Sequence, residues 1–251
     1  MSGSEKPLRV QLFGKPAVLY KGTRQPRVPK RCLAMLAVLA LDRSNLDRTE
    51  LALKFWPNDG RERARTNVRR HLHVLRTTLN VGHTTLRLLK ETHGNVAIDW
   101  SVVSVDVAEF LEAAESQDHR RALDLYRGPI LDGVFEDAIL EMREQFRLRF
   151  IGVLSRALVD ASTSRNVESV ISLGNRLTRE DPWNEGAVRE LMAAHYSRGE
   201  RALALTIYDR LAKTLAEDLQ AEPAPATRSL RNLILSSRSH DPVKILPVLG
   251  H

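Results

Sequence analysis

The chain opens with alternating hydrophobic and polar positions. Leu8, Val10 and Leu12 alternate with polar neighbours, and the alternation resumes at Val18 after a Gly-Lys-Pro break. A period of two places every second side chain on the same face of a strand. The pattern therefore predicts a small antiparallel sheet, with one face in solvent, over residues 8–29.

Two helices are expected after this sheet. Lys30–Asp42 forms a helix-length segment whose centre, Leu33 to Ala40, is apolar on every side. A helix of this kind belongs in the buried centre of a small domain. Asp47 and Glu50 form a capping box, which predicts a second helix that starts beside them and stops at Pro57.

The third predicted helix, over residues 61–79, is amphipathic and basic. Its apolar stripe, at 100° per residue, consists of Ala64, Val68, Leu72, Leu75 and Leu79. Its opposite face carries Arg63, Thr66, Arg70, His73 and Thr77, with Arg69 and Arg76 on one flank. The spacing predicts a helix that packs on its scaffold by one side and presents cations on the other.

Strand-like residues return after Gly82, and Gly94-Asn95 predicts a tight hairpin turn between Leu89 and Val96. A β-ribbon directly after an arginine-rich helix is the arrangement of a winged helix-turn-helix. Residues 1–102 are therefore predicted to form an α+β winged-helix DNA-binding domain.

From Val105 onward the periodicity predicts helices and no further strands. The expected helices are Asp106–Ser116, His119–Tyr126, Asp137–Val159, Asn166–Arg179, Glu185–Ser197 and Arg201–Leu219. Helix pairs joined by short polar turns predict an all-α, tetratricopeptide-like repeat domain over residues 103–235. Residues 236–251 are expected to form a flexible tail.

Composition narrows the class of protein. Hydrophobic residues at 43% and charged residues at 27% are typical of a soluble globular chain. The longest apolar run, Cys32 to Leu41, is about half as long as a membrane span. No signal peptide is visible before the first strand, so a cytoplasmic protein without a membrane segment is expected. Cys32 is the single cysteine, which excludes an intrachain disulfide.

The charge is divided unevenly along the chain. Residues 1–100 carry 19 Lys and Arg against 8 Asp and Glu, whereas residues 101–251 carry 19 against 23. A basic N-terminal part predicts a domain that binds a polyanion. The mildly acidic remainder is typical of a domain that faces a protein partner.

Several segments resemble known families. Leu8–Gly14, Pro29-Lys30, Leu51–Pro57 and Val68–Arg76 resemble parts of an OmpR-type winged helix. A second set resembles the bacterial transcriptional activator domain, and it consists of Asp106–Phe110, Ala122–Gly133, Glu180–Trp183, Tyr196–Gly199, Ala202–Tyr208 and Leu219–Pro223. This pairing is that of the antibiotic-regulatory, SARP-type activators of actinobacteria. The resemblance implies a transcription activator that binds promoter direct repeats in double-stranded DNA, pairs as a homodimer and helps recruit RNA polymerase.

The chain departs from the family pattern at three places. His73-Val74 stands where Ser-Arg is more usual, so the DNA sequence that is read stays open. Phe135–Leu140 replaces an aromatic-led segment before the long helix. Neither a receiver domain nor a Gly-rich phosphate loop is found, so aspartyl phosphorylation and an ATPase module are not expected.

The residues expected to contact DNA lie on the basic helix and the ribbon. Arg is the commonest bidentate reader of guanine in the major groove. Base contacts are expected from Thr66, Arg69, Arg70 and His73, phosphate contacts from Lys30, Arg65 and Arg76, and wing contacts from Thr92, His93 and Asn95.

No catalytic residue, cofactor or metal site is predicted. The HExxH, GxSxG, GxGxxG and P-loop motifs are absent, and His71 and His73 lie about 200° apart on their helix. Two alternatives to an activator stay open. One is a repressor of the same fold, in which the helical domain only dimerises. The other is a helical-repeat adaptor whose basic front domain binds an acidic protein or RNA.

Overall fold

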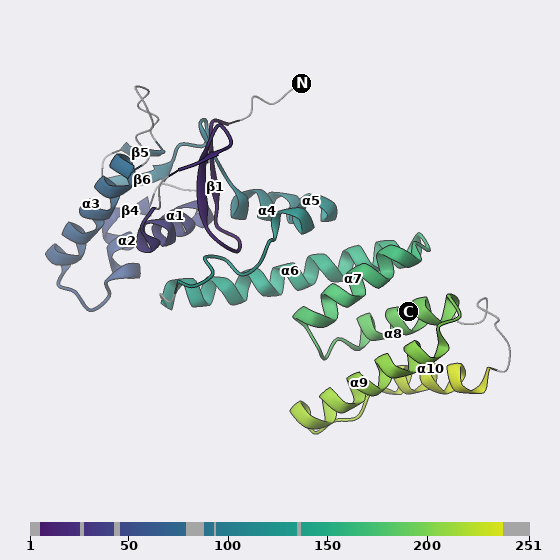
Figure 1. The fold of residues 1–251 in the computed structure, drawn as a ribbon. Helices are drawn as coiled ribbons and strands as arrows, with labels where there is room; N and C mark the ends of the chain where they lie inside the picture. The colour runs from purple at the N-terminus through teal and green to yellow at the C-terminus, as the bar shows by residue number, and fades with distance from the viewer. Residues whose placement is uncertain are drawn as a thin grey trace. The chain divides into compact units, whose positions relative to one another are not determined.

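The computed structural model of the protein describes residues 6–25, 28–42, 46–78, 88–92, 94–134 and 137–237 (Figure 1). The chain divides into two compact units, Met1–Leu148 and Arg149–His251. The first unit contains all the strands described, and the elements described in the second unit are all helices.

The described residues of the first unit form seven short strands, five helices and the beginning of a sixth helix. Its strands are β1 (Leu8–Gln11), β2 (Ala17–Tyr20), β3 (Thr23–Arg24), β4 (Leu46–Asp47), β5 (Leu89–Thr92), β6 (Asn95–Ile98) and β7 (Val103–Val105). Its helices are α1 (Lys30–Asp42), α2 (Arg48–Phe55), α3 (Arg61–Thr78), α4 (Asp106–Glu115) and α5 (His119–Leu125). The chain passes into the second unit within α6 (Asp137–Thr163).

The N-terminal strands form a four-stranded sheet in the order β3-β2-β1-β7. β1 and β2 are antiparallel, with Val10 opposite Val18, and the side chains that alternate inward from them are buried. This confirms the period-two prediction. β7 is parallel to β1 and lies at the start of residues 103–235, which were predicted to form an all-α domain. Three residues are too short a run to show an alternation that distinguishes a strand from a helix start.

α1 lies at the centre of the first unit with the predicted bounds. Every residue from Cys32 to Ala40 is buried, as expected for a helix that is apolar on all sides. Burial raises the pKa of the Cys32 thiol to about 11, and Sγ lies 3.6 Å from the carbonyl oxygen of His71. Cys32 is therefore a protonated core side chain.

A second sheet, in the order β4-β6-β5, lies beside α1 and α3 (Figure 1). β5 and β6 are antiparallel, and Thr92 at the end of β5 is opposite Asn95 at the start of β6. Asn95 is therefore the first strand residue after the turn, and the predicted Gly94-Asn95 turn is one residue too late. Gly94, with φ at +91°, takes the left-handed conformation that a two-residue hairpin loop requires.

The second unit continues from α6 into four helices. They are α7 (Val167–Glu180), α8 (Glu185–Ser197), α9 (Arg201–Leu219) and α10 (Pro225–Ser236). The six helices predicted after Val105 all exist, and α6 runs four residues beyond its predicted end. α10 was not predicted, although Pro225 at its first turn is a common helix start. From residue 238 the predicted tail lies outside the described residues.

Adjacent helices of the second unit pack as a helical array. The core of α8, α9 and α10 contains Val188, Met192, Ala193, Tyr196, Ala204, Tyr208, Leu211, Leu215, Leu230 and Ile234. At the α7–α8 crossing, a Cβ on Gly174 would lie 2.8 Å from Cγ of Leu191, so the two helices approach too closely for a larger residue. The array is consistent with the predicted helical-repeat domain.

A buried carboxylate joins the start of α4 to the N-terminal sheet. Asp106 is fully buried and accepts hydrogen bonds from the backbone N–H groups of Leu12, at 2.8 Å, and Phe13, at 3.1 Å. Nη2 of Arg127 lies 3.2 Å from the same carboxylate. The Phe13 ring also contacts Phe110 of α4, with ring centroids 5.4 Å apart. These contacts explain why α4 and α5 belong to the first compact unit; the predicted domain boundary between residues 102 and 103 stays a prediction.

Removal of the Asp106 carboxylate should therefore destabilise the first unit. Asp106→Ala leaves two buried N–H groups without their acceptor, and we expect it to lower the free energy of unfolding by about 3 kcal/mol. Asp124→Ala, on the exposed side of α5, removes the same group and should change stability by less than about 0.5 kcal/mol. Urea denaturation followed by circular dichroism measures both. Equal stabilities of the two variants would contradict the structural role of Asp106.

Candidate nucleic-acid interface

α3 has one fully buried face and one basic exposed face. Ala64, Val68, Leu72 and Leu75 are each at most 2% exposed, and they follow the predicted stripe. Leu79, the last predicted member of the stripe, lies outside the described residues. The buried stripe fixes the rotation of α3 about its own axis, so the opposite side chains must point away from the core.

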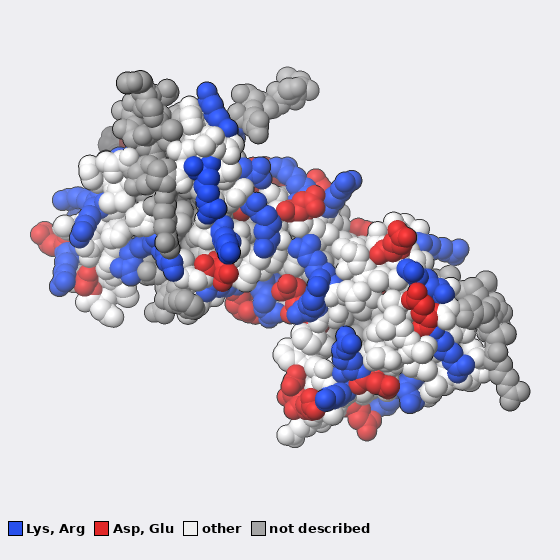
Figure 2. All heavy atoms as spheres, viewed as in Figure 1, with Lys and Arg blue, Asp and Glu red and all other residues white. Residues whose placement is uncertain are grey.

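Six of the predicted DNA contacts are exposed on this helix: Arg65, Thr66, Arg69, Arg70, His73 and Arg76. Figure 2 shows basic side chains gathered at the edge where Figure 1 places α3. The Thr66 hydroxyl donates to the carbonyl oxygen of Glu62 at 2.9 Å, which leaves its oxygen available only as an acceptor. The arginine side chains supply the donors of the surface.

The turn before α3 is held by side-chain hydrogen bonds. Nδ2 of Asn67 donates to the Asp59 carboxylate at 3.0 Å. Nδ1 of the His71 ring lies 2.8 Å from the carbonyl oxygen of Asn67, and the ring lies 5.1 Å from that of Trp56 between centroids. His71 thus has the structural role that its place beside the core stripe predicts. These contacts secure the α2–α3 connection on which the direction of α3 depends.

The predicted DNA contacts on the β5–β6 ribbon differ in their exposure to solvent. Thr92 is exposed at the end of β5, whereas Asn95 is half-buried on β6. His93 lies outside the described residues. Thr92 is thus the described wing residue that is freely accessible, and the prediction for Asn95 rests on a partly covered side chain.

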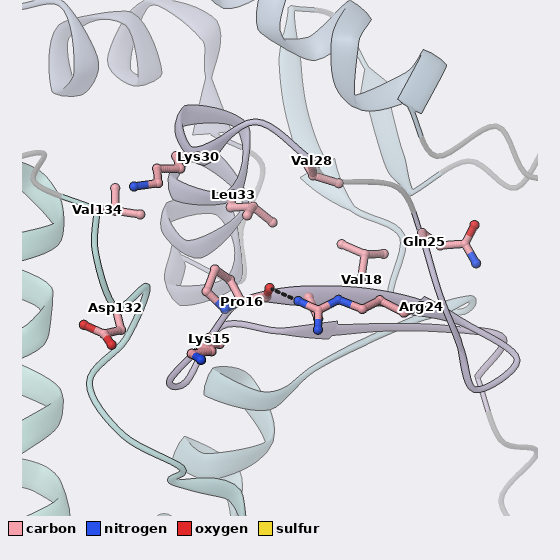
Figure 3. Close-up of a pocket in the computed structure, with 11 residues that line it drawn as sticks. Lys15, Pro16, Val18, Arg24, Gln25, Val28, Lys30, Leu33, Asp132 and Val134 are labelled. Atoms are coloured by element: carbon pink, nitrogen blue, oxygen red, sulfur yellow. Dashed lines mark hydrogen bonds between the residues drawn. The ribbon is translucent and has the colours of Figure 1, made fainter.

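Lys30, a predicted phosphate contact, lies apart from the α3 arginines. Its Nζ donates to the carbonyl oxygen of Gly133 at 2.6 Å. It lines a pocket of about 410 Å³ between the N-terminal sheet, α1 and residues 132–134 (Figure 3). None of the other predicted contacts lines this pocket. The structure therefore does not bring Lys30 together with the remaining candidate residues.

The structure adds Glu91 and Arg48 to the candidate interface, and neither was predicted from the sequence. Glu91 on β5 forms ion pairs with Arg48, the first residue of α2, and with Arg76 of α3. Asp47 caps α2 by accepting from the backbone N–H of Thr49, and hydrogen bonds from Thr49 lower the pKa of the Asp47 carboxyl. The cap fixes the first turn of α2 and with it the backbone of Arg48. In the sequence, Arg48 and Glu91 are 43 residues apart, and no local pattern relates them.

Membrane-spanning helices and metal-binding clusters were sought among the described residues. No helix among them has the length and apolar content to cross a bilayer. Nor do they bring three His, Cys, Asp or Glu side chains together in a way that could hold a metal ion.

A basic helix packed on α1 and α2 beside a β-ribbon, followed by a helical array, is consistent with a winged helix-turn-helix regulator that carries a helical-repeat domain. Residues 106–235, half of the sequence, match the family of the bacterial transcriptional activator domain, and the chain belongs to this family. This confirms the resemblance to the SARP-type transcriptional activators.

Curated relatives are named as regulators. The chain is 28% identical over 257 residues to the transcriptional regulatory protein MoaR1 of Mycobacterium tuberculosis, and the match covers 91% of this chain and 79% of MoaR1. It is 24% identical over 254 residues to the regulatory protein DnrI of Streptomyces peucetius, and this match covers 91% of this chain and 92% of DnrI.

A solved structure shares the fold. The structure of Mycobacterium tuberculosis EmbR in complex with a low affinity phosphopeptide matches with a TM-score of 0.69 and 23% sequence identity. The match covers 98% of this chain and 70% of the EmbR chain. At this identity the likeness supports the fold and carries no residue roles.

The two faces of α3 should differ sharply in their effect on stability. Leu75→Ala opens a cavity in the core and should lower the free energy of unfolding by about 3 kcal/mol. Arg70→Ala, on the exposed face, should change it by less than about 0.5 kcal/mol. Urea denaturation of both variants tests the orientation of the helix. A large loss of stability in Arg70→Ala would show that the basic face is packed.

Proposed function

We propose that this protein is a sequence-specific, DNA-binding transcription activator. It binds direct repeats upstream of a promoter as a homodimer, at least on DNA, and helps recruit RNA polymerase in the cytoplasm. The observation that carries the proposal is the exposed arginine face of α3 opposite a fully buried stripe. A function as an enzyme is not part of the proposal, since MoaR1 and DnrI are named as regulators.

The chemistry of the basic face suits the major groove of B-DNA. The groove admits an α-helix, and a guanidinium can donate two hydrogen bonds to O6 and N7 of guanine. We assign base contacts to Thr66, Arg69, Arg70 and His73. Arg65 and Arg76 then contact phosphates on either side of the groove. Arg65 and Arg76 are eleven residues apart, which is about 16 Å along the helix and enough to reach separate phosphates.

The second unit suits a protein partner better than a nucleic acid. Its large exposed hydrophobic side chains include Val159, Trp183, Leu203, Leu219 and Leu235. Among them, Trp183 is of the residue type most enriched where binding energy is concentrated at protein interfaces. This supports a role of the helical array in pairing protomers or in binding polymerase.

Substitution of the central arginines tests the DNA proposal. Arg69→Ala and Arg70→Ala should each weaken binding to the cognate operator by about 1–3 kcal/mol, because each removes a base-edge donor pair. Arg120→Ala, exposed on α5, removes an equal charge and serves as the control. The operator is first obtained by selection of bound genomic fragments, and affinities come from fluorescence anisotropy.

Binding of all three variants with wild-type affinity would exclude α3 as the reading helix. Competition by single-stranded RNA or an acidic peptide that exceeds competition by duplex DNA would instead favour the adaptor.

Activation is tested separately from binding. We expect a reporter gene behind the bound promoter to lose expression when the gene for this protein is deleted, and to regain it on complementation. Arg70→Ala should fail to complement, whereas Arg120→Ala should complement fully. Expression that rises on deletion would identify a repressor of the same fold.

A further inference from the structure

Three guanidinium groups gather around one carboxylate where α2, α3 and the ribbon meet. Arg48 of α2, Arg69 and Arg76 of α3 and Glu91 of β5 line a pocket of about 350 Å³, with Leu72 beside them. Three cations against one anion leave an excess of positive charge in a small space. The pocket can therefore attract a second anion, or an anion that takes the place of the Glu91 carboxylate.

Glu91 engages two of these arginines with separate oxygens. Oε2 pairs with Nη2 of Arg48, and Oε1 pairs with Nη2 of Arg76. The Glu91 side chain is 24% exposed, and that of Arg76 is 52% exposed, so solvent and ligands can reach the pair. Nη2 of Arg48 and Nη2 of Arg76 are therefore the donors that a competing anion would take over from Glu91.

A phosphodiester offers these arginines the same contacts as the carboxylate. Each group presents two oxygens that share one negative charge, and a guanidinium binds both kinds through parallel N–H donors. A DNA strand that lies against α3 would bring its phosphates to the edge of the recognition helix, where Arg76 is exposed.

We propose that Glu91 occupies the place of a DNA backbone phosphate in the free protein and is exchanged for that phosphate when duplex binds. The inference rests on the proposed function. Glu91 is then a built-in competitor: binding must break its two ion pairs, so affinity for any duplex is lower than the arginines alone would give. Because phosphate contacts carry no sequence information, the effect is equal on operator and on other DNA.

Glu91→Gln tests the proposal, since the amide keeps the size of the side chain and removes its charge. We expect affinity for the operator and for a mixed-sequence duplex to rise by the same factor, about fivefold. Glu62→Gln, on an exposed residue of the first turn of α3, gives an equal change in net charge and serves as the control. Glu91→Asp, whose shorter side chain spans the two arginines less well, should give a smaller rise.

A double-mutant cycle with Arg76→Ala separates exchange from a general charge effect. In the wild type the phosphate contact of Arg76 is offset by the loss of its pair with Glu91. Arg76→Ala should therefore weaken DNA binding more in the Glu91→Gln background than in the wild type. In the Glu62→Gln background it should weaken binding only as much as in the wild type.

Each other outcome overturns the inference. Equal gains from Glu91→Gln and Glu62→Gln would reduce the effect to net charge. Weaker binding of Glu91→Gln to the operator alone would make Glu91 a base contact, since a carboxylate can accept from cytosine. Unchanged binding would show that no phosphate enters the pocket. A wild-type protein that binds no duplex overturns the proposed function as well, whereas wild-type binding that Arg70→Ala weakens leaves that function standing.

Discussion

The burial of one stripe of α3 is the constraint on which the rest of the interface depends. Val68, Leu72 and Leu75 are packed into the first unit so completely that α3 cannot rotate without exposing them to water. The direction in which the helix presents the arginines on its other side is therefore fixed by this buried stripe. A helix ordered in this way before it binds loses little conformational freedom on binding DNA.

The same surface shows that cations near a binding site need counter-charges in the free protein. Five arginines between positions 63 and 76 repel one another. Glu91 reduces this repulsion in the last turn of α3, where it pairs with Arg76. Arg48 takes part in the same network from the start of α2, where Asp47 fixes the backbone. A carboxylate that pairs with exposed arginines stabilises the free protein relative to the DNA complex. It therefore lowers the affinity of the protein for DNA.

The contacts of Asp106 and Phe13 join α4 and α5 to the N-terminal sheet within the first unit. The residues that match the activator-domain family begin at position 106, yet α4 and α5 pack on the N-terminal sheet. The aromatic rings of Phe13, Phe110 and Tyr126 form the apolar side of this junction. A regulator cut between residues 102 and 103 would expose this surface, so the winged helix and the first helical hairpin are best treated together.

Local periodicity was enough to predict α1, the two faces of α3 and the six helices that follow Val105, because the spacing of apolar residues reflects which side each helix buries. Tertiary structure alone decided the pairing of β7 with β1, the ion pairs of Glu91 and the bond from Lys30 to Gly133. These contacts join residues from 15 positions apart, for Arg76 and Glu91, to 103 positions apart, for Lys30 and Gly133, and a charge or a three-residue strand carries no local mark of its partner.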